Sequence, residues 1–486
     1  MGNADNTSVN RESLFIGGRW VAPLQGASFD VVEAATEKVL GTAAMAGVGD
    51  IDAAVAAARE ALRGPWAALG NSERADLLDR FAAALKSRGR ETAALVSREN
   101  GMPISLSGSV NGFGPSVMVS YYASLIRNAP TEDVRPSAFG GRTVVRNEPV
   151  GVVAAITPWN YPQPLAAMKI APALAAGCTV VLKPAPETAL DAYAFAEAAE
   201  EAGLPAGVLN VVPAGREAGA YLVEHPGVDK VAFTGSTVAG RAIGEVCGRL
   251  LRPVTLELGG KSAAIVADDA DLSVFAAGLL GVSLVNNGQT CHASTRILAP
   301  RSRYDAVVEA VTETVRALLV GDPLEKSTQI GPLVSAAQRD RVLGYVEDGR
   351  SAGHRITTGG AVPADQPIGW FVEPTVFEGV DNAARIAQEE IFGPVLTITP
   401  YGDEAEAVAI ANDSEYGLGG TVWTSDEEHG LALASQIHSG TVGVNHYELD
   451  LAAPFGGVKA SGLGRELGPE GLRPYYSAKS IYLATR

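Results

Sequence analysis

Cys291 is the residue whose surroundings most favour chemistry in this 486-residue chain. It stands in the stretch NNGQTCHAST, which has no helical or strand periodicity, so we expect its thiol on a loop where backbone N–H groups can stabilise a thiolate. Cys178 lies in an apolar run and Cys247 on a predicted helix, so both are expected to be buried and inert. His292 follows the thiol directly, but adjacency in sequence does not make the two side chains face each other. The sequence therefore predicts one reactive cysteine without naming its base.

Glu257 breaks the pattern of an otherwise apolar strand, VTLELGG. Residues that contradict their local pattern are often functional. Burial would raise the pKa of this carboxyl group, which suits a general base that works near neutral pH. The alternative is a solvated carboxylate at the exposed end of a strand.

Asn160 lies in TPWNYP, directly after the apolar run GVVAAIT. In open α/β sheets ligands bind beyond the carboxyl ends of the strands, and an amide there can donate a hydrogen bond to a developing oxyanion. The alternative is a turn in which Asn adopts a left-handed conformation.

Three further motifs offer groups to a phosphate or a ribose. FTGSTVAG leads a predicted strand through a glycine turn into a helix, whose first N–H groups suit a phosphate, although the pattern is not GxGxxG. VLKPAPET places Lys183 after another strand, and QEEIFGPV places acidic residues before a strand. Each motif is weak by itself, because a solvated lysine or a loop carboxylate explains it equally well.

The elements that position these residues alternate regularly. Apolar strands and helices follow one another from about residue 151 to 259, which predicts a parallel, doubly wound sheet. The alternation resumes near Gly260 and predicts a second α/β unit with helices over 272–286 and 304–320. Nearer the start we expect a helix capped by Asp50 and another over 72–88, ending before Gly89.

Composition excludes several classes of protein. The chain has 38 Lys and Arg against 55 Asp and Glu, a net charge of −17 that disfavours nucleic acid and anionic membranes as partners. Three separated cysteines and six scattered histidines suggest neither a disulfide framework nor a metal site. The start, MGNADNTSVN, does not resemble a signal peptide, so a soluble protein of the reducing cytoplasm is expected.

Taken in order, these motifs resemble one family. PWNYP, LKPAPET, FTGSTVAG, LELGGKS, GQTC, EEIFGPV and PFGGVKASGLGRE are similar to the motifs of NAD(P)-dependent, hydrolytic aldehyde dehydrogenases, from about Phe15 to Leu483. The resemblance implies an α/β fold with a Rossmann-like cofactor domain (1–126 and 150–259), an α/β catalytic domain (260–453), and a small β oligomerisation flap with bridging segments (127–149 and 454–486).

The resemblance also implies a role for each site residue. Cys291 would form a thiohemiacetal and then a thioester, Asn160 and the Cys291 backbone N–H would bind the oxyanion, and Glu257 would activate water. The implied cofactor contacts are Ile156, Thr157, Pro158, Trp159, Lys183, Pro186, Glu187, Phe233, Gly235, Ser236, Ala239, Leu258, Gly259, Glu390 and Phe392. The implied substrate contacts are Tyr161, Leu165, Met168, Thr290, His292, Asp450 and Leu451.

One departure from the family pattern concerns the cofactor. Many NAD-preferring relatives carry a Glu three residues after the lysine, where this chain has Pro186, with Glu187 following. We expect NAD, and Pro186 leaves NADP open.

The substrate is expected to be an apolar medium-chain, terpenoid or aromatic aldehyde. Met168 stands where relatives acting on carboxylated semialdehydes carry Arg and relatives acting on quaternary-ammonium aldehydes carry Trp; Met suits an irregular apolar chain. Asp450 favours the alternative of a cationic betaine or amino aldehyde. A catalytically silent structural relative, or one that transfers the acyl group to CoA, would be expected to lack Cys291 or Glu257.

The C-terminal KSIYLATR reads as a strand without a partner in its own neighbourhood. By resemblance it would join the strand at 143–149 in the flap and extend the sheet of another subunit, which implies a dimer or a homotetramer.

Overall fold

A computed structural model describes residues 9–484. Its larger sheet has eight strands, and the five in its centre, β11, β10, β7, β8 and β9, are parallel to one another. In spatial order the strands are β19 (Gly462–Leu463), β11 (Val254–Glu257), β10 (Lys230–Thr234), β7 (Val152–Ile156), β8 (Thr179–Lys183), β9 (Leu209–Val211), β1 (Leu14–Ile16) and β2 (Arg19–Val21). The doubly wound sheet expected from the sequence is confirmed.

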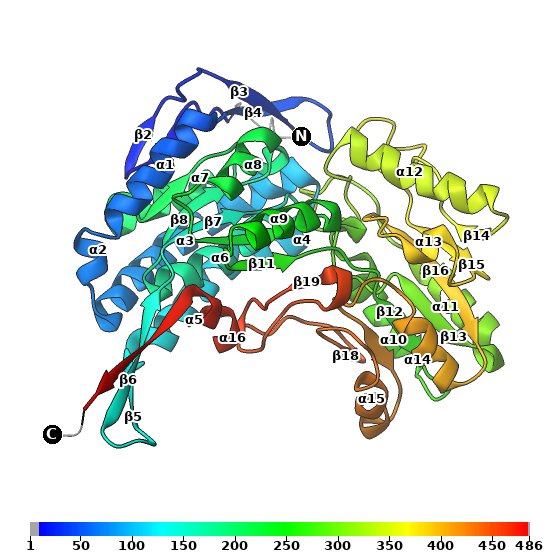
Figure 1. The fold of residues 1–486 in the computed structure, drawn as a ribbon. Coiled ribbons are helices and arrows are strands. Elements are labelled where there is room, and N and C mark those ends of the chain that lie inside the picture. The colour runs from blue at the N-terminus through cyan, green and yellow to red at the C-terminus, as the bar shows by residue number, and fades with distance from the viewer. Residues whose placement is uncertain (1–8, 485–486) are drawn as a thin grey trace.

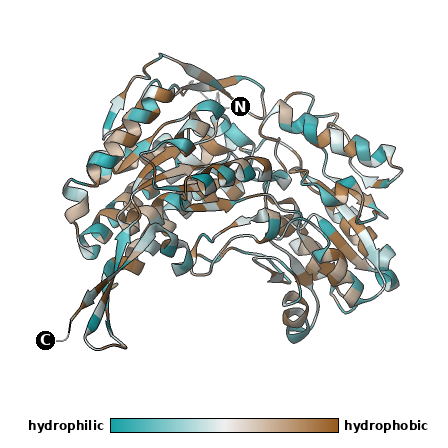
Figure 2. Cartoon of the chain, in the orientation of Figure 1, coloured by the Kyte–Doolittle hydropathy of each residue, from teal (hydrophilic) through white to brown (hydrophobic). Residues whose placement is uncertain are grey.

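Successive side chains of the buried strands point to opposite faces of this sheet, and a different set of helices covers each face. Val153 and Ala155 of β7 pack into one apolar cluster, together with helices α3 (Asn71–Asn100), α5 (Gly114–Arg127), α6 (Pro162–Ala176) and α7 (Tyr193–Ala202). Val152 and Ala154 point to the other face and pack with α1 (Val48–Ala61), α8 (Arg216–Glu224) and α9 (Thr237–Arg249). Figure 2 shows these strands as brown, hydrophobic ribbons between helices whose outer turns are teal.

A second sheet of seven strands begins after Gly260. Helices α10 (Leu272–Leu279) and α11 (Tyr304–Arg316) cover one face, and α14 (Glu404–Asn412) packs on the other. Its strands, in spatial order, are β14 (Arg355–Thr358), β15 (Thr375–Glu378), β16 (Val395–Tyr401), β13 (Arg296–Pro300), β12 (Ala263–Val266), β17 (Thr421–Trp423) and β18 (Gly443–Val444). Helices α12 (Ala336–Ser351), α13 (Arg385–Gln388) and α15 (Glu427–Ala434) lie in the connections.

A three-stranded sheet projects from the body of the molecule, with the C-terminus near its tip (Figure 1). It consists of β5 (Glu132–Pro136), β6 (Arg142–Pro149) and β20 (Tyr476–Leu483). The tail strand has no partner adjacent in sequence, as expected, and β20 pairs antiparallel with β6 of its own chain along its full length, as the family resemblance implied. That pairing joins segments far apart in sequence, which local patterning cannot detect.

Several helix limits differ from those expected. Helix α1 begins at Val48, and Asp50 caps it from within the first turn by accepting the Gly47 N–H at 2.9 Å. Helix α3 continues through Gly89 to Asn100, because this glycine allows a close approach of the Gly112 carbonyl, which would lie 2.2 Å from a Cβ. The helices expected over 272–286 and 304–320 end earlier, at Leu279 and Arg316.

Short elements complete the fold. They are β3 (Ser28–Val32), β4 (Val39–Ala44), α2 (Pro65–Ala68), α4 (Ile104–Ser107), α16 (Gly468–Leu472), the π-helical turns η1 (Gly108–Phe113) and η3 (Leu280–Leu284), and the 3₁₀ turns η2 (Pro186–Thr188), η4 (Val285–Gly288), η5 (Arg301–Arg303), η6 (Lys459–Ser461) and η7 (Arg473–Tyr475). No helix within residues 9–484 combines the length and apolar character needed to cross a membrane.

Candidate active site

Cys291 lies on the irregular chain between η4 and β13, as the sequence predicts, and its side chain is half-buried. Burial raises the pKa of its thiol, and the charges of Glu390 and Glu257 raise it further, whereas the backbone N–H groups of His292 and Cys291 lower it. Burial therefore outweighs the thiolate-stabilising donors expected from the loop. Cys178 and Cys247 are buried, as predicted.

A buried network of amides surrounds Asn160. The Asn160 side-chain Nδ2 donates to the backbone carbonyl of Gln289 at 3.0 Å. The backbone carbonyl of Asn160 accepts the side-chain N–H groups of Asn100 at 3.0 Å and Asn286 at 2.9 Å. A side-chain amide nitrogen carries two hydrogens, so the second remains available for an oxyanion. The sequence analysis missed Asn100, Asn286 and Gln289; the run of amides just before the cysteine was the signal for the last two.

Glu257 ends strand β11 and is 2% exposed, so the alternative of a solvated carboxylate is wrong. Neither of its carboxyl oxygens has a hydrogen-bond partner within residues 9–484. Burial raises the pKa of this carboxyl well above its usual value, and the charge of Glu466 raises it further. A carboxyl without partners and with a raised pKa can take a proton from water.

A buried ion pair influences Glu257. Lys169 Nζ lies 2.8 Å from Glu466 Oε1, and it also donates to Thr234 Oγ1 at 2.5 Å. The Lys169 charge lowers the pKa of Glu257, whereas that of Glu466 raises it. The sequence analysis missed this pair because the two residues are far apart along the chain.

The strands β7, β8 and β10 end at one edge of the large sheet, which we call the cofactor edge. Ser236 accepts the Ala239 N–H at 3.3 Å and caps helix α9, whose other first N–H groups remain suited to an anion. Lys183 donates to the carbonyl of Pro184 at 2.9 Å, and burial lowers its pKa to about 8, although Glu187 acts in the opposite direction. A helix N-terminus beside a lysine fits the pyrophosphate and ribose of a dinucleotide.

Glu390, which precedes strand β16 of the second sheet, lies next to this edge. Its Oε1 accepts the Gly260 N–H at 3.0 Å, and a Cβ on Gly259 would lie 2.5 Å from its Oε2. Burial raises the pKa of Glu390 to about 7. Phe392 packs edge-on against Trp159 with 5.3 Å between ring centroids. A carboxylate framed by glycine and aromatic rings fits the hydroxyls of the second ribose.

The other predicted cofactor contacts fall on the same strand ends and turns. The buried ones are Ile156, Thr157, Phe233, Leu258 and Gly259. The half-buried ones are Pro158, Pro186, Gly235 and Ala239, and the exposed ones are Glu187 and Ser236.

An apolar cluster contains most of the predicted substrate contacts. Leu165 and Met168 of α6 are buried in it, and Cys291, Tyr161 and Leu451 pack against it. The Tyr161 hydroxyl lies 2.8 Å from Thr290 Oγ1, which donates to the carbonyl of Val285 at 3.0 Å.

An aromatic stack stands beside the nucleophile. The ring of His292 stacks on Tyr447 with 4.6 Å between centroids and lies edge-on to Phe455. Burial lowers the pKa of His292 to about 4, so its ring is neutral at physiological pH. Asp450 is exposed, and its Oδ1 accepts the Ala452 N–H at 2.8 Å within its own loop.

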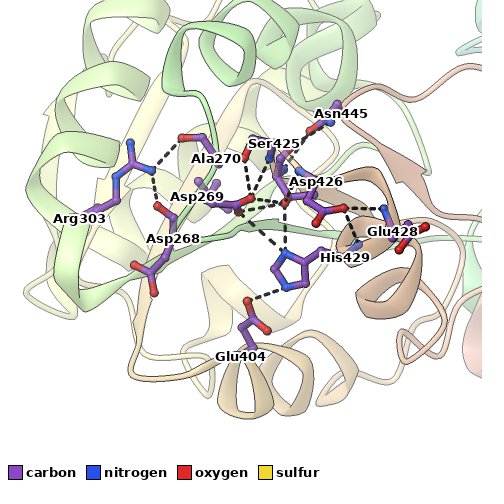
Figure 3. A network of polar contacts seen from close by, with 12 residues as sticks. Asp268, Asp269, Ala270, Arg303, Glu404, Ser425, Asp426, Glu428, His429 and Asn445 are labelled. Carbon is purple, nitrogen blue, oxygen red and sulfur yellow. Dashed lines mark hydrogen bonds and ion pairs between the residues drawn. The ribbon is translucent and has the colours of Figure 1, made fainter.

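The segment 441–455, which we call the substrate wall, lines a cavity of about 760 Å³. Its Asn445 joins the polar network around Asp269 that is drawn in Figure 3. Asp269 accepts hydrogen bonds from the hydroxyls of Thr424 at 2.8 Å and Ser425 at 2.7 Å, and Asn445 accepts the Thr424 N–H at 3.0 Å. The wall is therefore irregular chain with a few fixed points.

The class of protein that this fold and site define is a dinucleotide-dependent oxidoreductase with a cysteine beside the cofactor edge. The Aldehyde dehydrogenase family model matches residues 20–481. The chain belongs to the aldehyde dehydrogenase family, as its motifs indicated, and oxidises aldehydes with NAD as cofactor.

Three relatives illustrate the match. Geranial dehydrogenase of Castellaniella defragrans is 54% identical over 477 residues, 98% of this chain and 99% of the relative. The Mycobacterium tuberculosis aldehyde dehydrogenase complexed with NAD+ is 46% identical, with a TM-score of 0.96 over 99% of both chains. A mutant of aldehyde dehydrogenase C from Pseudomonas syringae, complexed with NAD+ and octanal, is 38% identical, with a TM-score of 0.94 over 98% of both chains.

Proposed function

We propose that Cys291 is the nucleophile of this aldehyde dehydrogenase. Its thiol releases its proton to water as the sulfur adds to the aldehyde carbon, and the resulting thiohemiacetal oxyanion accepts hydrogen bonds from Asn160 Nδ2 and the Cys291 backbone N–H. The chemistry that NAD supplies when bound is acceptance of the hydride from that carbon, which leaves a thioester on Cys291.

Glu257 completes the reaction in this proposal. Its carboxylate takes a proton from water, the hydroxide adds to the thioester carbon, and the thiolate leaves as the carboxylic acid forms. The absence of hydrogen-bond donors on its oxygens among the described residues supports this role, because nothing competes with the water for the carboxylate.

The residues at the cofactor edge divide the dinucleotide between them in this proposal. The N-terminus of α9 with Gly235 and Ser236 holds the pyrophosphate, Lys183 the adenosine ribose, and Glu390 the nicotinamide ribose. The half-buried Pro186 and exposed Glu187 stand where the adenosine 2′-hydroxyl would lie, so a comparison of NAD with NADP is part of the test below.

The substrate that we propose is a terpenoid aldehyde of medium length. The observation that carries this proposal is the apolar cluster that joins Cys291 to Leu165 and Met168. The 54% identity to a geranial dehydrogenase points to the same class of substrate, and the octanal complex of a more distant relative shows that such chains suit this fold. Asp450 caps its own loop, which argues against a dedicated site for a cationic aldehyde.

A panel of aldehydes tests the substrate. The experiment compares kcat/KM, first with NAD and then with NADP, for geranial, octanal, benzaldehyde, betaine aldehyde and succinic semialdehyde. The proposal expects the highest value with geranial and NAD. A higher value for betaine aldehyde or succinic semialdehyde would overturn the substrate class while leaving the nucleophile untouched.

We divide the chain as its motifs suggested, with cofactor segments 1–126 and 150–259, a catalytic segment 260–453, and flap and bridging segments 127–149 and 454–486. The flap exposes apolar side chains on its strands, with Val134 58% and Tyr482 81% exposed, which supports assembly into a dimer or tetramer. Deleting 479–486 should shift sedimentation toward smaller species; an unchanged sedimentation coefficient would remove the flap from assembly.

A further inference from the structure

Two carboxyl groups are buried together behind the Asn160 turn, in a place that the proposed mechanism does not use. Glu99 in the last turn of α3 is 0% exposed, and Asp191 before α7 is 1% exposed. The two carboxyl groups lie close enough that each influences the pKa of the other. No ion pair within residues 9–484 involves either carboxyl, and each acts on the other without a cation between them.

Both carboxyl groups cannot be ionised at this depth. Two adjacent carboxylates without a cation repel each other and lose their hydration, so the pair retains a shared proton. Asp191 Oδ2 has no other hydrogen-bond donor within the described chain, which leaves it free to share that proton with Glu99. Burial, the larger cause, raises the pKa of Asp191 to about 7.

The three remaining carboxyl oxygens, two of Glu99 and one of Asp191, accept hydrogen bonds from segments next to the active site. Glu99 accepts the backbone N–H groups of Leu190 at 2.9 Å and Asp191 at 3.2 Å, in the segment that follows Lys183 and η2. Gln163, in the first turn of α6, donates to the Asp191 carboxyl and to its carbonyl at 2.9 Å. The pair thus ties the start of α6 to the chain beyond the cofactor edge.

The residue next to Glu99 holds the backbone of the turn that carries Asn160. Asn100 donates to the carbonyls of Trp159 at 3.1 Å and Asn160 at 3.0 Å. The C-terminal end of α3 therefore acts on both sides of Asn160. Asn100 holds the turn before α6, and Glu99 acts through Asp191 on Gln163 in the first turn of α6.

We propose that Glu99, Asp191 and Gln163 form a positioning clamp that holds the Asn160 amide in the orientation needed for oxyanion binding. The clamp touches neither substrate nor cofactor and acts through the first turn of α6. This inference rests on the proposed role of Asn160 and does not depend on the identity of the aldehyde.

Asp191→Ala tests the clamp because it removes the shared proton and the carboxyl oxygen that accepts from Gln163, whereas the backbone hydrogen bonds of Gln163 and Glu99 can remain. We expect kcat per folded molecule to fall about 10-fold or more, since small misplacements of catalytic groups have large effects on rate, with the KM for aldehyde changing less than about 3-fold. Asp191→Asn should restore kcat to within about 3-fold of wild type, because its amide can donate to Glu99 in place of the proton.

Asp50→Ala is the matched control for lost stability. Asp50 is also a buried carboxyl, 2% exposed, that accepts two backbone N–H groups, those of Leu24 and Gly47, but it caps α1. It should lower the midpoint of thermal unfolding without lowering kcat per folded molecule. If Asp191→Ala and Asp50→Ala have the same kcat, the clamp is overturned.

Gln163→Leu keeps the test decisive if Asp191→Ala does not fold. It removes the donor and keeps the shape, and we expect the same selective fall in kcat. Unchanged kcat in Gln163→Leu would overturn the clamp. Any aldehyde that the wild type oxidises serves as substrate, so a failure of the terpenoid proposal would appear in the panel above and not here.

Discussion

The cofactor edge and the substrate wall differ in how their backbones are built. The cofactor edge consists of short turns that follow the buried parallel strands β7, β8 and β10. The substrate wall, 441–455, contains only the two-residue strand β18 and is held by contacts such as the bond from Asn445 to Thr424. Side chains at the ends of buried strands are held in fixed positions. An irregular segment on a rigid scaffold tolerates changes of sequence and conformation.

That difference assigns separate tasks to the two regions. In the proposed mechanism, the turns after strands hold groups that every substrate needs, namely Asn160, Lys183 and Ser236. We propose that the wall supplies groups that only particular aldehydes contact, such as Tyr447. Substitutions in the shared machinery should therefore affect all aldehydes alike, whereas substitutions in the wall should change the ranking of aldehydes.

Cys291→Ala should have the largest effect. Because no other group can form the thioester, turnover of every aldehyde should fall by about 10⁴-fold or more, while NAD binding measured by fluorescence titration stays near wild type. Cys247→Ala, a buried thiol on α9, is the control and should retain activity. Near-wild-type turnover in Cys291→Ala would contradict the assignment of the nucleophile.

Glu257→Gln should slow thioester hydrolysis by about 10²- to 10⁴-fold, the usual contribution of a general base. Hydride transfer should be less affected, so rapid mixing should record a burst of NADH equal to the number of active sites. The exposed Glu309 on α11 provides the control, as Glu309→Gln should leave the steady state unchanged. Loss of the burst together with the steady-state rate would show that Glu257 acts earlier.

Glu466→Gln should move the pH profile. The Glu466 charge raises the pKa of Glu257, after the larger effect of burial, so its removal lowers that pKa. A base is active when ionised, and its rate falls as pH falls through its pKa. The acidic limb of the hydrolysis-limited rate should therefore move to lower pH. The exposed Glu470 is the control, and Glu470→Gln should leave the limb in place; a shift to higher pH in Glu466→Gln would contradict the electrostatic argument.

Tyr447→Leu should have the smallest effect and should be selective. Loss of the stack with His292 removes about 0.5–1.5 kcal/mol, so kcat/KM for geranial should fall about 2- to 10-fold relative to octanal. Tyr482→Leu, at an exposed position of β20, should change neither value. An equal fall for both aldehydes would show that the wall acts on the shared chemistry and not on the choice of substrate.

The fold was predictable where local pattern and burial agree. The runs around β7, β8 and β10 are apolar because both faces of these strands are covered, and that pattern is visible in any short window of sequence. Glu257 was recognisable because it violates such a pattern. The motifs then added the family, and with it the roles proposed for Cys291 and Asn160.

Long-range pairing was not predictable in the same way. Gly89 suggested a helix end, yet it lies inside α3 because a neighbouring backbone approaches there. The Lys169–Glu466 ion pair joins residues far apart along the chain, and the β20–β6 pairing was foreseen only through the family resemblance and not from local pattern.

The sequence by itself determined the strands, the reactive residue types and the family, because these depend on side-chain chemistry and short-range periodicity. Only the tertiary structure decided how those residues behave. It raised the pKa of the half-buried Cys291, left the Glu257 carboxyl without a hydrogen-bond partner among residues 9–484, and turned Asp450 into the cap of its own loop. The physical reason is that pKa values and hydrogen-bond partners depend on burial and on neighbours supplied by other parts of the chain, which no local stretch of sequence contains.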